Sequence, residues 1–338
     1  MQITTLISNV ALLFIMMIPG VIMIKTRLCD DGFSKGISNL VLYIAQPALI
    51  VYTYIDFSGN FSDIWFNSLM VFLLSLLAHG LFAAVSLICF KRAPDGKRRM
   101  LRFATVFANA AFMGIPLIQA VLGNEFAIYA SIYNIAFNLF LWTFGVYLCT
   151  ADRDEDGDGV TDGDIATDYH EVRSKIRADK ILLKLIIHPV TLASVVGVIL
   201  LACGVNTTAY NLGLFADSLL MLKNLVAPLS MTVIGLRLAK VDFHGVFKDL
   251  HLYEFLLLRH IALPAVMIAV IKLLVLCGVS VSANVTLVTV ILAATPAASS
   301  ATMFAVKYDC DAEYTTRLVT ISTLLSIATM PLMVLLAS

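Results

Sequence analysis

The sequence predicts an all-α protein that crosses a membrane many times. Of its 338 residues, 60% are hydrophobic and 14% are charged, and the mean hydropathy is +0.91. Soluble globular proteins contain about 45–50% apolar and about 25% charged residues. A water-soluble fold of this length could not bury so much apolar surface, which argues against a soluble enzyme. The 23 basic and 23 acidic residues cancel, so there is no net charge to attract a nucleic acid.

Ten apolar runs are long enough to cross a bilayer, because a spanning helix needs roughly 20 mainly apolar residues. We expect spans at 4–24, 37–55, 65–90, 100–122, 126–150, 185–204, 212–236, 255–277, 283–305 and 315–336. The first run is followed, not preceded, by basic residues, which favours a retained span over a cleaved signal peptide.

The basic residues orient these spans. The connections 25–36, 91–102, 151–184, 237–260 and 306–317 contain 21 of the 23 Lys and Arg residues, and the alternating connections contain none. Cytoplasmic connections of membrane proteins are rich in Lys and Arg. The pattern therefore predicts a multi-pass protein of the plasma (inner) membrane with both termini on the non-cytoplasmic side.

The chain divides into two halves of five spans, residues 1–150 and 185–338, joined by an acidic cytoplasmic linker, residues 151–184. Because five is odd, the second half enters the membrane in the opposite direction to the first, which is the condition for an inverted repeat. Prolines support the repeat, since three pairs fall in corresponding spans of the two halves: Pro19 with Pro189, Pro47 with Pro228, and Pro116 with Pro296.

Two corresponding spans are predicted to be interrupted within the membrane. They contain an amide, a glycine, prolines and hydroxyl residues among alanines: Asn109, Gly114 and Pro116 in span 4, and Thr295, Pro296, Ser299 and Ser300 in span 9. Small residues at a tight helix crossing would explain either stretch alone. A symmetric pair of interrupted helices favours a transport site, whose half-helix N-termini suit an anionic group such as a carboxylate.

The sequence around these residues resembles the auxin efflux carrier family. The run from Asn109 to Leu117 is similar to the family's span 4 signature, and other segments agree: YIAQPA from Tyr43, NLFLWTFG from Asn138, Pro228 with Gly235, and FAVKY from Phe304. The likeness extends over essentially the whole chain. Ala111 is a departure, because the family often has glycine there.

The resemblance implies a ten-span, two-domain, elevator-type fold similar to those of bile-acid symporters and sodium/proton antiporters. Spans 1, 2, 6 and 7 would form a scaffold, and spans 3–5 and 8–10 a transport domain in which the interrupted spans 4 and 9 cross. The family includes plant auxin exporters and bacterial carriers of the malate or malonate type. We therefore expect a secondary transporter of small organic anions, mono- or dicarboxylates, that works by alternating access at this crossing.

The expected substrate-binding site combines residues of both interrupted spans. Asn109 is expected to hydrogen-bond the substrate or the crossing backbone. The backbone N–H groups near Gly114 and from Thr295 to Ser300 are expected to hold a carboxylate. Pro116 and Pro296 are expected to keep the two helices interrupted.

Four further polar residues within the predicted spans are candidates for a role in binding or coupling. By analogy with the family, Gln46 is expected to contact the substrate from the scaffold side. His79 in the middle of span 3 either takes up a proton in coupling or stays neutral, bonded to a backbone carbonyl. Asn134 and Asn138 share one helix face, where they either support the crossing region or bond across helices. The predicted spans contain no dense set of buried carboxylates, so the sequence shows no sodium or proton site of the usual kind.

The acidic linker contains a weak candidate for a metal site. Asp154, Asp156, Asp158 and Asp162 match positions 1, 3, 5 and 9 of a calcium-binding loop, but Ile165 replaces the glutamate expected at position 12. A disordered acidic linker explains the composition equally well. The six cysteines are spread singly, so we expect no other metal site and no cofactor.

The main alternative is a sodium- or proton-coupled symporter or antiporter of the same fold with a different cargo, and a membrane receptor is a remote one. An enzyme within the membrane would need convergent catalytic residues. The six histidines are not at HExxH spacing and mid-span acids are absent, so no enzymatic activity is expected. The expected partners are the anionic substrate and the lipid bilayer, and a homodimer is compatible because dimers are common in this fold.

Overall fold

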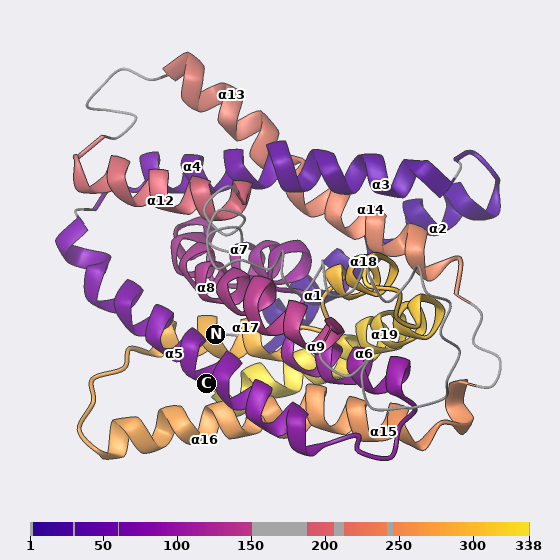
Figure 1. The fold of residues 1–338 in the computed structure, drawn as a ribbon. Coiled ribbons are helices and arrows are strands. Elements are labelled where there is room, and N and C mark those ends of the chain that lie inside the picture. The colour runs from indigo at the N-terminus through magenta and orange to yellow at the C-terminus, as the bar shows by residue number, and fades with distance from the viewer. Residues whose placement is uncertain are drawn as a thin grey trace, which may run out of the picture.

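The computed structural model describes residues 3–29, 31–59, 61–150, 188–205, 213–241 and 246–337, and every regular element within them is a helix (Figure 1). The helices of the first half are α1 (Ile3–Ile15), α2 (Ile18–Lys25), α3 (Asp31–Leu40), α4 (Gln46–Ile55), α5 (Phe61–Ile88), α6 (Asp95–Val106), α7 (Ile115–Val121), α8 (Ala127–Phe140) and α9 (Val146–Thr150). Those of the second half are α12 (Pro189–Ala202), α13 (Gly213–Asn224), α14 (Val226–Leu238), α15 (Leu250–Leu257), α16 (Leu263–Leu276), α17 (Ala283–Ala294), α18 (Ser300–Lys307) and α19 (Ala312–Ala337).

Short turns of other helix types connect these α-helices. The π-helical turns are η1 (Val41–Ala45), η2 (Ala110–Gly114), η4 (Leu141–Gly145) and η6 (Leu258–Ala262), and the 3₁₀ turns are η3 (Asn124–Phe126) and η5 (Val246–Lys248).

Seven helical stretches are long and apolar enough to cross a membrane: Ser8–Lys25, Gly32–Ile55, Ile64–Ile88, Asn124–Thr150, Gly213–Leu238, Leu250–Leu276 and Ala312–Ala337. Three further apolar helices are shorter: Ala110–Val121, Pro189–Ala202 and Ala283–Ala294. Each predicted span overlaps one of these stretches. The linker aspartates proposed for calcium, Asp154, Asp156, Asp158 and Asp162, lie outside the described residues.

Three prolines are accommodated by wide helical turns. The turns η1, η2 and η6 each end two residues before a proline, namely Pro47, Pro116 and Pro264. A proline lacks the backbone N–H and clashes with the carbonyl four residues earlier. The i→i+5 bonding of a π turn adds a residue at that point. The helices therefore continue through these prolines instead of ending at them.

Helices of the first half of the chain pack against helices of the second half (Figure 1). The helix α2 of the first half packs against α14 of the second, and α12 of the second half packs against α4 of the first. Both contacts are close. A Cβ atom at Gly235 would lie 2.0 Å from the Met17 carbonyl oxygen, and one at Gly197 would lie 2.1 Å from the ring of Tyr54. This pairing is the one expected if spans 1 and 2 correspond to spans 6 and 7.

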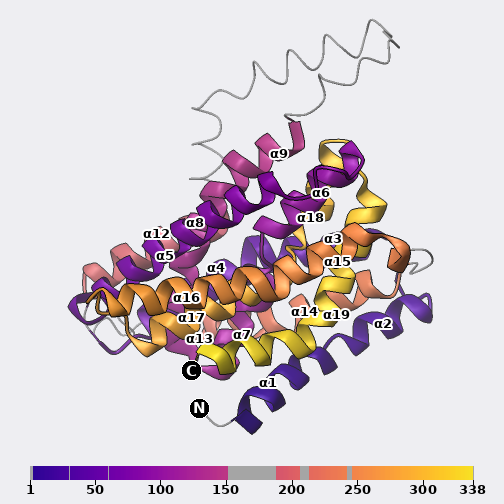
Figure 2. The same cartoon turned by 90° about the horizontal axis from the view of Figure 1, so that it is seen from below.

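The first and last helices also lie together. Contacts join α1 to α19, and both views place the N- and C-terminal ends of the chain close to each other (Figure 2). Two termini on the same side of a membrane are required by an even number of spans.

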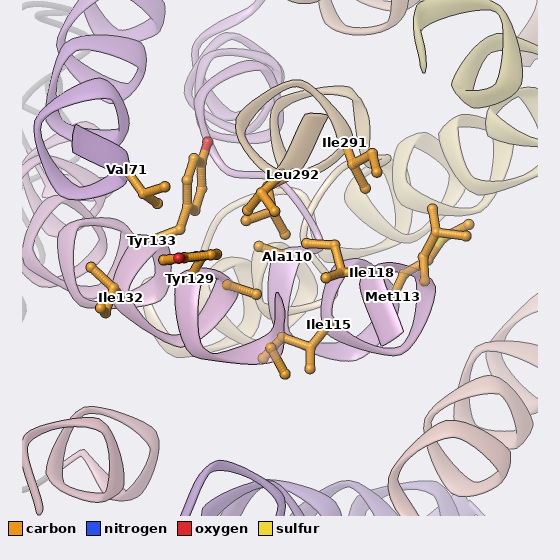
Figure 3. Packing of buried hydrophobic residues seen from close by; sticks show 14 of the residues in the cluster. Val71, Ala110, Met113, Ile115, Ile118, Tyr129, Ile132, Tyr133, Ile291 and Leu292 are labelled. Carbon is orange, nitrogen blue, oxygen red and sulfur yellow. The ribbon is translucent and has the colours of Figure 1, made fainter. Parts of the chain in front are cut away.

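Two buried apolar clusters surround the interrupted helices and include part of them. One contains Val71, Ile118 and Leu292, and the other contains Phe103 and Phe304. Figure 3 shows the first cluster, in which Leu292 of α17 points toward the helix that begins at Ala110. Both clusters include residues of the interrupted helices themselves, so the polar backbone ends of these helices lie in an apolar interior and need partners within the protein.

Candidate functional site

Span 4 is interrupted at residues 107–109. Helix α6 ends at Val106, Phe107 has an extended backbone (φ −95°, ψ 116°), and Asn109 (φ −78°, ψ 50°) immediately precedes η2. Pro116 lies elsewhere, as the second residue of α7, in the continuous helix that follows the interruption. The expectation that Pro116 keeps this helix interrupted is therefore wrong, because the chain breaks before the helix that contains Pro116.

Span 9 is interrupted at residues 295–299. Helix α17 ends at Ala294, Thr295 is extended (φ −60°, ψ 151°), and α18 begins at Ser300. Here the proline does lie within the interruption, because Pro296 directly follows Thr295.

The two interruptions cross and are joined by their backbones. Ala108 and Ala297 form an isolated antiparallel bridge. The Asn109 N–H donates to the Pro296 carbonyl oxygen at 2.7 Å, and the Ala298 N–H donates to the Phe107 carbonyl oxygen at 2.8 Å. Buried backbone groups left unpaired by the ends of helices are costly. Each interrupted span thus supplies the partners that the other needs, and two helix C-termini and two helix N-termini meet inside the protein.

Side chains at the crossing add polar contacts. The Nδ2 of Asn109 donates to the Oγ of Ser299 at 3.3 Å, and both residues are buried. The Oγ of Ser300 is buried and has no hydrogen-bond partner within the described part of the chain. The side chains of Asn109 and Ser299 therefore meet at the crossing, and Ser300 directly follows Ser299 at the start of α18.

Gly114 has a different role from the one expected. Its N–H donates to the Asn109 carbonyl oxygen at 3.1 Å, so it is not available to a carboxylate. A Cβ atom at Gly114 would lie 2.6 Å from Cδ2 of Leu292 and 3.4 Å from Cγ2 of Thr295. A side chain at this position would displace Leu292, because α17 passes directly against Gly114.

Gln46 reaches the crossing region from α4. Its side chain is fully buried, and its Nε2 donates to the Ala111 carbonyl oxygen in η2 at 2.7 Å. The Oε1 of Gln46 has no hydrogen-bond partner in the described structure. The predicted scaffold residue thus contacts the backbone just after the first interruption and has an unused acceptor.

The remaining predicted polar residues make structural bonds. The Nδ1 of His79 lies 2.7 Å from the Ser75 carbonyl oxygen one turn earlier, which corresponds to the neutral, backbone-bonded alternative. Asn134 donates to the Ala130 carbonyl oxygen at 2.9 Å. Asn138 donates to the Oγ1 of Thr191 at 3.1 Å and so links α8 to α12.

Arg237 also reaches the crossing, although the pattern of basic residues in the sequence places it in a cytoplasmic connection. It lies in the last turn of α14, is half-buried, and donates from Nη1 to the Ser299 carbonyl oxygen at 3.0 Å. A small cavity adjoins this contact. It has apolar walls and three hydroxyl residues, and its lining includes Ile234, Leu238, Val319, Ser299, Thr320 and Thr323. A cationic group beside hydroxyls in an apolar cavity suits an organic anion.

Arg259 was also missed. It belongs to η6 and is fully buried at the crossing, where its guanidinium bonds backbone carbonyls of α6 and α17. A signal for it was present in the sequence, because an arginine within an apolar run is by default a functional candidate. Arg259 also lies at the end of the basic connection 237–260, where an arginine is expected as an anchor, so the sequence alone does not distinguish the two roles.

A family model described as "membrane transport protein" matches residues 5–334 and so covers both interrupted spans. That model is the one for auxin efflux carriers. The chain belongs to the auxin efflux carrier family. The resemblance predicted from the sequence is thereby confirmed, and this auxin efflux carrier family member is a multi-pass membrane transporter. A comparison with curated proteins found no match.

Proposed function

We propose that the protein is a secondary transporter of small organic anions, mono- or dicarboxylates, that bind beside the crossing of spans 4 and 9. The observation that carries the proposal is the cavity in which Arg237 faces Ser299 at the N-terminus of α18. A guanidinium group and a helix N-terminus both attract a carboxylate. In this conformation the cavity has about 10 Å³ of free space, so it would have to widen before its apolar walls could hold the organic part of the substrate.

The position of the cavity supports alternating access. Met17 comes from span 1, and Ile234, Arg237 and Leu238 belong to α14, the helix of span 7, whereas the other lining residues come from spans 9 and 10. In the expected fold of two inverted five-span repeats, spans 1 and 7 belong to the scaffold and spans 9 and 10 belong to the transport domain. A substrate at that boundary would be exposed to one side or the other as the two domains move past each other, which is the elevator mechanism that we propose.

Substrate exchange in proteoliposomes tests this function. We expect the wild-type protein to exchange one acid from a panel of labelled carboxylates saturably. Asn109→Ala should lower that exchange about tenfold or more, because it removes the buried hydrogen bond to Ser299. Ser218→Ala is a suitable control, since Ser218 is an exposed residue of α13 whose hydroxyl bonds only within its own helix. Exchange of no acid by folded wild-type protein would reject the proposal, and exchange unchanged by Asn109→Ala would place the site elsewhere.

We also expect His79 to take no part in coupling. Its ring lies among Tyr133, Phe137 and Phe140, and its Nδ1–H is used by the Ser75 carbonyl. His79→Gln should therefore leave the shape of the pH profile of exchange unchanged, even if the rate falls through altered packing. Measuring exchange from pH 5 to pH 8, the range in which an ordinary histidine titrates, checks this. A pH profile that flattens in His79→Gln would instead establish proton coupling through this residue.

A further inference from the structure

Arg259 is the most deeply buried charged residue of the crossing. It has no solvent exposure, and its guanidinium donates four hydrogen bonds to three backbone carbonyl oxygens. One bond goes from Nη1 to Thr105 at 3.2 Å, one from Nη2 to Ala293 at 3.0 Å, and two go to Thr295, from Nε at 3.2 Å and from Nη2 at 2.7 Å. Four of the five N–H donors of the planar fork are thus directed at backbone.

These carbonyls belong to the C-terminal ends of two half-helices. Thr105 lies in the last turn of α6, Ala293 lies in the last turn of α17, and Thr295 is the residue that follows α17. The last carbonyls of a helix have no partner within it and carry the negative end of the helix dipole. Two such ends converge here, and Arg259 lies between them.

No acidic side chain shares this position. Among the ion pairs of the described residues, none involves Arg259. The ring of Phe82 lies nearby, with the guanidinium carbon 5.8 Å from the ring centroid. A buried arginine without a carboxylate is costly unless other groups compensate its charge. Here the compensating groups are the converging carbonyl dipoles.

The same π turn, η6, also contacts the second interruption through His260 and Ser322. His260 lies next to Arg259, and its Nε2 is 2.8 Å from the Oγ of Ser322, which accepts the Ala297 N–H at 2.9 Å. Since Ser322 already accepts from the backbone, its own hydroxyl hydrogen is available to His260. The turn η6 therefore contacts both kinds of backbone group at the crossing. Arg259 bonds carbonyl oxygens directly, and His260 bonds Ser322, which in turn accepts the Ala297 N–H of the second interruption.

In transporters with interrupted helices, unwound carbonyls and half-helix C-terminal ends coordinate the coupling cation. We propose that Arg259 is a tethered cation that occupies this place permanently, so that the crossing keeps its shape and its anion site without a bound metal ion. This inference rests on the proposed function, because it states that the transport of the anion needs no sodium. Arg259 is then a positioning residue, acting through the backbone of both interrupted spans.

Removing the tethered charge should create a site for a free cation. We expect Arg259→Ala to lower the unfolding temperature and to lower exchange about tenfold or more, because several charge-assisted hydrogen bonds are lost. Added guanidinium, at concentrations too low to denature the wild type, should raise the unfolding temperature of Arg259→Ala and restore part of its exchange. Urea, which has a similar shape but no charge, should do neither. Wild-type exchange should be equal in sodium and choline buffers.

The outcomes separate this inference from the proposed function. The response of the unfolding temperature to guanidinium tests Arg259 even if no carboxylate is exchanged, whereas the wild-type exchange assay tests the function alone. Equal responses of Arg259→Ala to guanidinium and urea, or wild-type exchange that needs sodium, would overturn the inference. If Arg259→Ala does not fold, Arg259→Lys and Arg259→Met decide, since both have about the volume of arginine. The lysine variant should keep most of the unfolding temperature that the methionine variant loses, and equal losses would overturn the inference.

Discussion

Arg237→Gln is expected to lower carboxylate exchange about 100-fold, which is the loss of one charge-assisted hydrogen bond to a substrate held away from water. Arg237 supplies the cationic group of the cavity, and its contact with Ser299 spans the boundary between α14 and α18. Glutamine retains donors and much of the length of the side chain, so the variant isolates the charge. Exchange in proteoliposomes, with the amount of folded protein measured by size-exclusion chromatography, gives the comparison.

Two matched variants complete that test. Lys240→Gln removes an equal charge three residues further along, at an exposed position beyond the end of α14, and should leave exchange within about twofold, because an exposed charge contributes little. Arg237→Lys keeps the charge but not the planar fork that pairs with a carboxylate, so its exchange should lie between those of the wild type and Arg237→Gln. Exchange reduced equally by Lys240→Gln and Arg237→Gln would show a general effect of charge and refute a role for Arg237 in the site.

The close contact between α2 and α14 is expected to fail when Gly235 is replaced by alanine. The new Cβ atom would lie 2.0 Å from the Met17 carbonyl oxygen, which belongs to backbone and cannot rotate away. Overpacking of this kind costs about 1–3 kcal/mol and occasionally more, and we expect Gly235→Ala to lie at the upper end. The measurement is the unfolding temperature of purified protein in detergent.

Gly36→Ala is the matched control for that variant. Gly36 lies inside α3, and a Cβ atom there would have no neighbour within 4 Å. Alanine is favoured over glycine in a helix by about 0.5–1 kcal/mol, so this variant should unfold at the same or a slightly higher temperature. If Gly235→Ala were as stable as Gly36→Ala, the two helices could not be packed as closely as described.

The positions of the spans follow from one-dimensional information. Hydropathy places each apolar run, since any helix in a bilayer must be apolar over most of its length. The interruption of spans 4 and 9 is also visible in the sequence, because glycine, proline and polar residues at mid-span are unfavourable unless the helix ends lie against protein or a cavity. The same reasoning pointed to Asn109 and Ser299, whose side chains meet at the crossing.

The point at which a helix breaks was less predictable. Pro296 lies in its interruption, but Pro116 lies within a continuous helix because the π turn η2 accommodates it, and the chain breaks at residues 107–109 instead. That break is stabilised by hydrogen bonds to residues about 190 positions later in the chain. No local pattern contains such partners.

By itself, then, the sequence determined a multi-pass helical membrane transporter of the auxin efflux carrier family with two interrupted helices. Only the tertiary structure decided which polar groups serve the crossing. Arg237 and Arg259 look like basic residues at the ends of spans, and their role depends on carbonyls that other helices bring to them. Gly114 looks like a donor to substrate, but its neighbour Leu292 comes from the other half of the chain. The physical reason is the same in each case: a charge, or the lack of a side chain, acquires its function from what packs against it.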